Sequence, residues 1–127
     1  RGILARANSE EKLGFTAIEE AQLPTNHAIV GYSLAHSWWL PEEIYLGIRY
    51  HHDAAILATP ALTPPLTSRY RIAISQFAEY LVQRQTGLSH TLEWPKLGEA
   101  CLKLLDIGED DIEEIVAEAV PVIAAEE

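Results

Sequence analysis

The sequence contains no methionine and a single cysteine, and basic residues are scarce in it. Cys101 has no second cysteine with which to form an internal disulfide, and it lies in an apolar segment, so we expect a buried thiol and a reducing compartment. Nine Lys and Arg residues stand against 19 Asp and Glu residues, for a formal net charge of −10. A chain without a basic stripe does not neutralise phosphates, so we expect no nucleic-acid partner.

Long apolar runs are also absent. No stretch approaches the roughly 20 apolar residues that span a bilayer, and residues 1–12 are mostly polar and charged rather than signal-like. We therefore expect a cytoplasmic protein without a membrane partner. Because the chain lacks methionine and starts at Arg1, we also expect it to be a piece of a longer protein.

Apolar residues are nevertheless plentiful, at 48% of 127 residues, which suffices for the core of one domain. They recur at helical spacing in several segments, and no segment alternates with period two. The sequence therefore predicts an all-α fold, an irregular multi-helix bundle of about six helices that forms a single unit over residues 1–127.

The bounds of the helices follow from apolar spacing and from residues that start or stop a helix. Thr16 is expected to cap the first helix, and Thr25 or Asn26 the second. Gly31, inside the second helix, predicts a close approach by another helix. Segment 54–66 contains three prolines and no charge, and is expected to be a loop. The predicted helices cover residues 16–23, 27–38, 41–52, 67–86, 94–105 and 109–119.

Histidines are concentrated at the second and third predicted helices. His27 shares the apolar row of the second helix with Trp38, and we expect this row to face inward. His51 and His52 stand near the end of the third helix, and Asp53 follows them. Imidazole and carboxylate ligands suit zinc, iron, manganese and nickel, so these side chains are candidate ligands of a divalent metal.

Two interpretations of these histidines remain open. Either they bind a metal, or each ring donates one proton to a carbonyl and accepts another from a neighbour, which fixes helix packing without a metal. Spacing alone favours the packing interpretation, because no short ligand motif such as HExxH is present. Adjacent helical residues also point about 100° apart, so His51 and His52 share one ion only if the helix ends there.

The segment NHAIVGYSLAHSWWLPEEIYLGIRYHHD, residues 26–53, resembles the central part of HDOD domains. These domains are bacterial all-helical signalling modules related to the HD and HD-GYP phosphohydrolases. Their pattern places a histidine before Val-Gly, then a Leu and a Trp, then Leu-Pro and a helix that ends in His-His. The matching residues are His27, Val30, Gly31, Leu34, Trp38, Leu40, Pro41, Ile44, Ile48, His51 and His52.

The resemblance implies a helical bundle of the HD-domain type. It extends over roughly residues 15–118 and concerns the second half of an HDOD domain, which implies that the upstream half is missing from this chain. Carried over to this sequence, it makes His27, His51 and His52 the candidate ligands of iron, manganese, nickel or zinc. Catalytic relatives use a further aspartate in the next long helix, and the resemblance places Gln76 at that position.

The function that the resemblance implies is regulatory. We expect a non-catalytic domain in bacterial signal transduction, without a required cofactor, that contacts a partner protein, a second copy or the missing half of the domain. Trp39 is the expected interface anchor, because Trp38 takes the inward position. The alternative is a metal-dependent phosphohydrolase of the HD superfamily that acts on a phosphoester or a cyclic dinucleotide.

Overall fold

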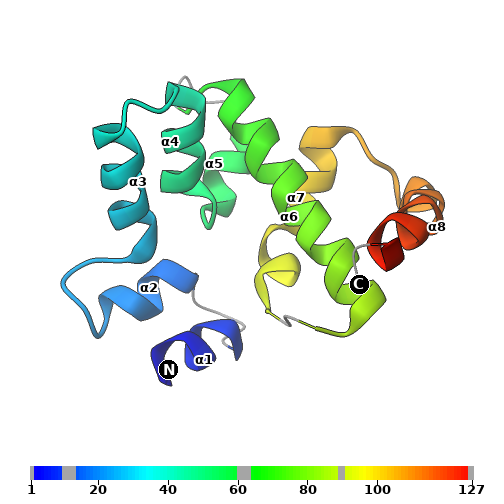
Figure 1. Ribbon diagram of the computed structural model, residues 1–127, viewed down its shortest axis with the longest axis horizontal. Helices are drawn as coiled ribbons and strands as arrows, with labels where there is room; N and C mark the ends of the chain where they lie inside the picture. The colour runs from blue at the N-terminus through cyan, green and yellow to red at the C-terminus, as the bar shows by residue number, and fades with distance from the viewer. Residues whose placement is uncertain (1, 10–13, 60–63, 89–90, 126–127) are drawn as a thin grey trace.

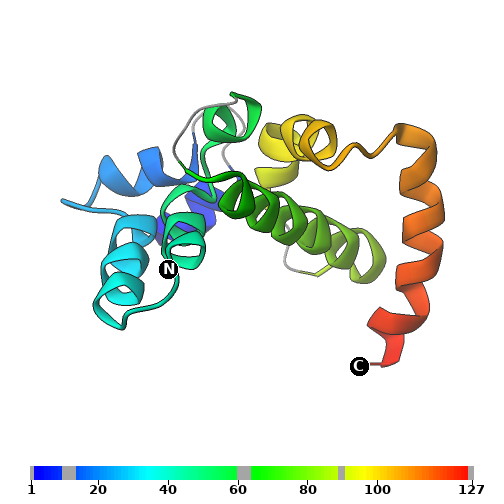
Figure 2. The same cartoon turned by 90° about the horizontal axis from the view of Figure 1, so that it is seen from above.

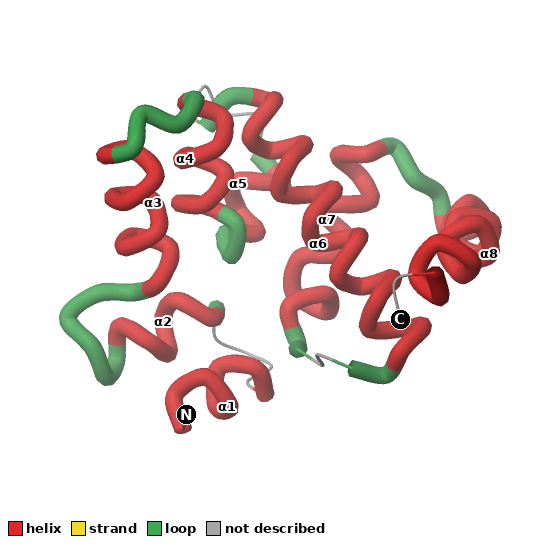
Figure 3. The backbone as a smooth tube through the Cα atoms, viewed as in Figure 1, coloured by secondary structure: helices red, strands yellow, loops and turns green. Residues whose placement is uncertain are grey.

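The computed structural model describes residues 2–9, 14–59, 64–88 and 91–125. In these ranges the chain forms eight α-helices and no strand (Figures 1 and 3), which confirms the all-α class and exceeds the six helices expected. The helices are α1 (Gly2–Ser9), α2 (Phe15–Glu20), α3 (His27–Ser37), α4 (Glu42–Tyr50), α5 (Ala54–Ala58), α6 (Leu66–Thr86), α7 (Glu93–Leu105) and α8 (Glu109–Ala125).

The first helix, α1, has no counterpart among the predicted helices. Its buried Ala7 packs with Phe15 and Ile18 of α2 in a small hydrophobic cluster. α2 itself begins at Phe15, after Gly14, and no side chain caps it. The prediction that Thr16 caps this helix is therefore wrong, because the helix starts one residue earlier with the buried Phe15.

Helix α5 occupies part of the segment that was expected to be a loop. The carboxylate of Asp53 starts this helix by accepting hydrogen bonds from two backbone amides of the first turn, at 3.0 and 3.2 Å. Leu57 then anchors the helix in the hydrophobic core. The loop prediction is wrong for residues 54–58, and residues 60–63 lie outside the described part of the chain.

The longest helix, α6, crosses the middle of the molecule and packs against α4 and α7 (Figures 1 and 2). Its Ile72 and Ala73 join Leu57, Leu97 and Cys101 in the larger of two clusters of buried side chains. Cys101 is fully buried, as expected, and burial raises the pKa of its thiol to about 11.

Helix α8 lies at one side of the molecule, across the direction of α6 (Figure 2). Both carboxylate oxygens of Glu113 accept hydrogen bonds from the Arg84 guanidinium, at 2.8 and 3.0 Å, and so join α8 to α6. Across the described ranges, no helix has the length and hydropathy that a membrane span requires.

Helix α3 has the cap and the close helix contact that its sequence predicts. The Asn26 side chain accepts a hydrogen bond from the Ile29 amide at 2.9 Å and caps the helix. Gly31 faces α4, where a Cβ atom on this glycine would stand 2.8 Å from Cγ2 of Ile48. The predicted cap and the predicted close approach are both confirmed.

The outward face of α3 contradicts the prediction that its apolar row packs inward. Val30, Leu34 and Trp38 are 46%, 48% and 68% exposed, whereas Ala28 and Ala35 are buried. The smaller side chains allow α3 to lie close to its neighbours, so the bulky row is turned outward.

Candidate metal centre

Three histidine side chains from two chain segments meet at one point. His27 is the first residue of α3, while His51 and His52 follow the last residue of α4, Tyr50. The Nε2 atom of His27 lies 3.1 Å from Nε2 of His51 and 2.9 Å from Nε2 of His52. Because α4 ends at Tyr50, two adjacent histidines can reach the same point, which a continuing helix would prevent.

Two buried glutamates fix the orientation of two of these rings. Nδ1 of His27 donates to Glu19, and Nδ1 of His52 donates to Glu93, each over 2.6 Å. Burial by itself would raise the pKa of Glu93, but hydrogen bonds from His52 and Lys96 outweigh burial and lower it. The Glu93 carboxylate is therefore ionised at neutral pH and acts as an acceptor.

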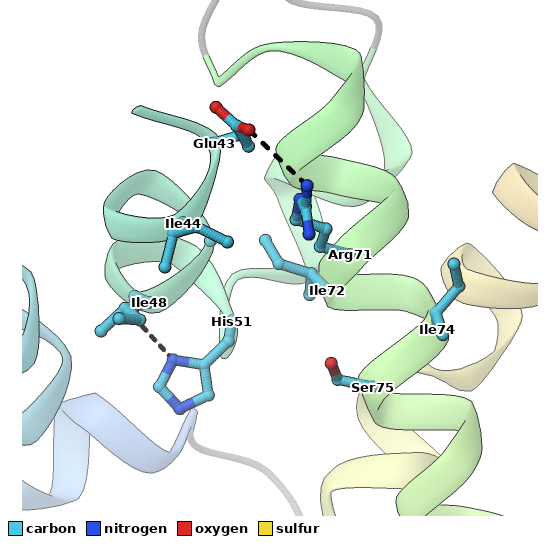
Figure 4. A pocket seen from close by; sticks show the side chains of 9 residues that line it. Glu43, Ile44, Ile48, His51, Arg71, Ile72, Ile74 and Ser75 are labelled. Carbon is cyan, nitrogen blue, oxygen red and sulfur yellow. Dashed lines mark hydrogen bonds and ion pairs between the residues drawn. The ribbon is translucent and has the colours of Figure 1, made fainter. Parts of the chain in front are cut away.

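The third ring is held by the backbone. Nδ1 of His51 donates to the carbonyl oxygen of Ile48 over 2.7 Å (Figure 4). Burial, helped by the neighbouring His52, lowers the pKa of His51 to about 4, so this ring is neutral at pH 7. Since carboxylate and carbonyl oxygens accept, each ring carries a proton on Nδ1, which leaves the three Nε2 atoms as the possible metal donors.

Among the described residues, the two glutamates that accept from the rings differ in their cationic partners. The ammonium group of Lys96 lies 3.2 Å from the Glu93 carboxylate and compensates it. The Glu19 carboxylate accepts from the ring and the backbone amide of His27, and within the described ranges no Lys or Arg pairs with it. A cation placed where the Nε2 atoms meet, either a proton or a metal ion, would compensate the Glu19 carboxylate.

The donor set suits a divalent metal. Two imidazole nitrogens bound tetrahedrally to one zinc at about 2.0–2.1 Å stand about 3.4 Å apart, so the observed separations of 2.9 and 3.1 Å need only small adjustments. Carboxylates that accept from the remote ring nitrogens are the usual outer support of such ligands. The His27 side chain is 39% exposed, which leaves the centre open to solvent on that side.

Two further residues singled out from the sequence lie outside the donor set. Asp53 is committed to capping α5. Gln76, at the position where the resemblance places a ligand aspartate, is buried, and its amide donates to the backbone carbonyl of His51 over 3.2 Å. Gln76 therefore supports the turn that carries the histidines.

Sequence reasoning missed the side chains that hold the rings in place. Glu19 is eight positions from His27 and Glu93 is 41 positions from His52, and no local spacing rule connects either pair. Phe15 was missed as well. Its ring stacks on His52 at a centroid distance of 4.7 Å and meets the His27 ring edge-on at 5.3 Å.

A hollow of about 560 Å³ opens beside the centre, between α4 and α6 (Figure 4). Aliphatic side chains form much of its wall. His51 lies at one end of it, and the ion pair of Arg71 with Glu43, at 3.6 Å, lies at the other (Figure 4). The hollow thus has a histidine of the centre at one end and a half-exposed arginine at the other.

Residues 2–54 match the profile of the HDOD domain. This segment runs from α1 through α4 and contains all three histidines, so the resemblance to HDOD domains is confirmed over these residues. HDOD domains are signalling-associated domains related to the HD domain. No curated protein and no solved structure matches the chain significantly. The extension of the resemblance to residue 118 and its assignment to the second half of a domain stay predictions.

Proposed function

We propose that this chain, whose residues 2–54 carry the HDOD match, is a non-catalytic regulatory module of bacterial cytoplasmic signalling. It holds one divalent metal ion on His27, His51 and His52 and acts through protein contacts. The convergence of three Nε2 lone pairs, each fixed by a hydrogen bond at Nδ1, supports the metal. Gln76 supports the lack of catalysis, because its amide is engaged with a backbone carbonyl where catalytic relatives use a carboxylate.

In this proposal the metal connects the N-terminal helices to the rest of the molecule. α1 packs on α2, and α2 has few contacts with α3. Phe15 and Glu19 of α2 both touch the histidine rings. Fixing His27 and His52 on one ion therefore fixes α2 with them, and metal occupancy controls how firmly the first two helices are attached.

Metal analysis of the full chain, purified without an affinity tag or chelator, tests the proposal. We expect near-stoichiometric metal in the wild type, a large loss in His51→Ala, and no loss in His36→Ala, which removes an exposed histidine outside the centre. The metal-loaded chain is expected not to hydrolyse phosphomonoesters or cyclic dinucleotides. A wild-type chain that stays metal-free after incubation with iron, manganese, nickel and zinc would contradict the metal site. The histidines would then serve only to fix the packing of the helices.

A metal-dependent phosphohydrolase is the second candidate, and the hollow beside His51 favours it. Arg71 is more than half exposed there and is the kind of cation that binds a phosphate group. Metal-dependent turnover of a phosphoester that is lost in both His51→Ala and Arg71→Ala would establish the enzyme over the regulatory module.

A further inference from the structure

Helix α3 turns a face of large apolar side chains toward solvent. Val30, Leu34 and Trp38 follow one another at intervals of four residues, and Trp39 stands directly after them with 93% of its surface exposed. We refer to these four residues as the α3 row. In Figure 1, α3 lies at the outer edge of the molecule with α4 on its inner side. Contiguous apolar surface of this kind marks a binding site more often than a free surface.

The backbone of Trp39 sets this residue apart from an ordinary exposed aromatic. Its φ is 59°, in the left-handed region, at the position after a helix end that glycine usually takes. The Leu40 amide reaches back to the Ala35 carbonyl over 3.1 Å, which closes the turn. Tryptophan is unfavourable here both for its backbone and for its exposure, and strained exposed residues of this kind accumulate at functional sites.

Negative charge lies at both ends of the α3 row. Residues 14–48 contain four glutamates and no Lys or Arg. Glu20, exposed, ends α2 beside the start of α3, and Glu42, also exposed, begins α4 just after the α3 row. Glu43 is paired with Arg71 and contributes less. The α3 row is therefore an uncharged apolar strip between two acidic ends.

We propose that the α3 row docks an amphipathic helix of a partner protein, with apolar side chains at helical spacing and Lys or Arg beyond them. This deepens the proposed function and rests on its protein-contact part. Side chains at intervals of four form a ridge that fits between those of a second helix. Basic flanks would lie opposite Glu20 and Glu42. A second copy of this chain fits less well, because it brings acidic ends together in either orientation.

Two designed helical peptides test this inference on the full chain. One has leucine on one face and lysine elsewhere, and its matched control has glutamate in place of every lysine. Calorimetry and tryptophan fluorescence follow binding at physiological salt. We expect the lysine peptide to bind and to shift the emission to shorter wavelength, and the glutamate peptide not to bind.

Substitutions then locate the binding site. Trp39→Ser should weaken binding of the lysine peptide at least tenfold, whereas Val122→Ser, at a 66% exposed apolar position of α8, should leave it unchanged. The double variant Glu20→Lys with Glu42→Lys should lose the lysine peptide while keeping the apolar surface. Equal binding of both peptides, or unchanged binding by Trp39→Ser, would overturn the inference.

Light scattering on the chain alone tests whether a second copy of the chain covers the α3 row. A wild-type dimer that Trp39→Ser converts to a monomer would show that a second copy covers the α3 row, which also overturns the inference. The metal content of the wild type is independent of these results. If the peptide does not bind, the proposal of a metal centre is unaffected. If the chain contains no metal, the result of the peptide experiment is unaffected.

Discussion

The Nε2 atoms of His27 and His52 lie 2.9 Å apart, although each ring already donates through Nδ1 to a buried glutamate. Two nitrogen lone pairs at this distance repel each other unless a positive charge lies between them. A metal ion would supply that charge without a further proton on either ring. A shared proton supplies it only by making one ring an imidazolium.

Replacing Glu93 with Gln should weaken metal binding by about 10–100-fold, the usual effect of removing an outer carboxylate. The amide keeps the shape of the side chain but loses the charge that orients and polarises His52. Glu99→Gln, an exposed position on the same helix, is the matched control. Competition with a chromophoric chelator measures the affinity, and equal affinities for the two variants would contradict this role of Glu93.

Removing the metal with a chelator should loosen α2 while leaving α7 unchanged. Phe15 and Glu19 contact the ligand rings directly, whereas α7 is anchored in the larger hydrophobic cluster by Leu97 and Cys101. Amide hydrogen exchange resolved by segment is the measurement. His51→Ala should show the fast α2 exchange of the chelated wild type with or without chelator. Identical α2 exchange in all samples would show that the centre does not attach this helix.

Two glycines inside neighbouring helices should respond oppositely to alanine. A Cβ atom at Gly31 would stand 2.8 Å from a methyl group of Ile48, while a Cβ atom at Gly47 meets nothing within 4 Å. Both variants gain helix propensity of about 1 kcal/mol, but Gly31→Ala also overpacks the α3–α4 contact. The difference in unfolding free energy should be about 1–3 kcal/mol in favour of Gly47→Ala. Urea unfolding of both variants measures it, and equal stabilities would mean that Ile48 moves aside freely.

The two glycines illustrate what the sequence could predict and what it could not. Helix α3, expected at residues 27–38, forms at His27–Ser37 because Asn26 is a strong local cap. The close approach at Gly31 also follows from sequence, since an interior glycine is unfavourable without a packing reason. Which face of α3 turns inward does not follow, because apolar spacing identifies a face but not the neighbour that covers it.

The sequence also predicts only part of the candidate metal centre. The convergence of His27, His51 and His52 was within reach of sequence reasoning, because the family pattern and the end of a helix both point to it. The carboxylate that orients His52 was not, since Glu93 is the first residue of α7 and only the tertiary fold brings it to the ring. Asp53 was considered as a candidate ligand because the prolines of segment 54–66 predicted a loop there. Its side chain instead caps α5, a helix that the sequence did not predict.

Cys101 should resist alkylation at pH 8 in the folded chain. Burial raises its pKa from 9.0 to about 11, so only about one thiol in a thousand is ionised at pH 8. The unfolded chain loses this proton first, so the contribution of Cys101 to stability is present below pH 9 and is lost between pH 9 and 11. Iodoacetamide labelling with and without urea checks the first expectation. Fast labelling of the folded chain at pH 8 would contradict it.

Trp39→Gly should stabilise the chain relative to Trp39→Ala, by about 1 kcal/mol. Both variants remove the same exposed indole, but only glycine adopts the left-handed backbone at this position without strain. Urea unfolding measures the difference in unfolding free energy, and binding of the lysine peptide is measured on the same samples. We expect Trp39→Gly to be more stable than the wild type as well, yet to bind the peptide weakly. A stability equal to that of Trp39→Ala would mean that the turn is not strained, and would remove the argument that this tryptophan is kept for binding at the expense of folding.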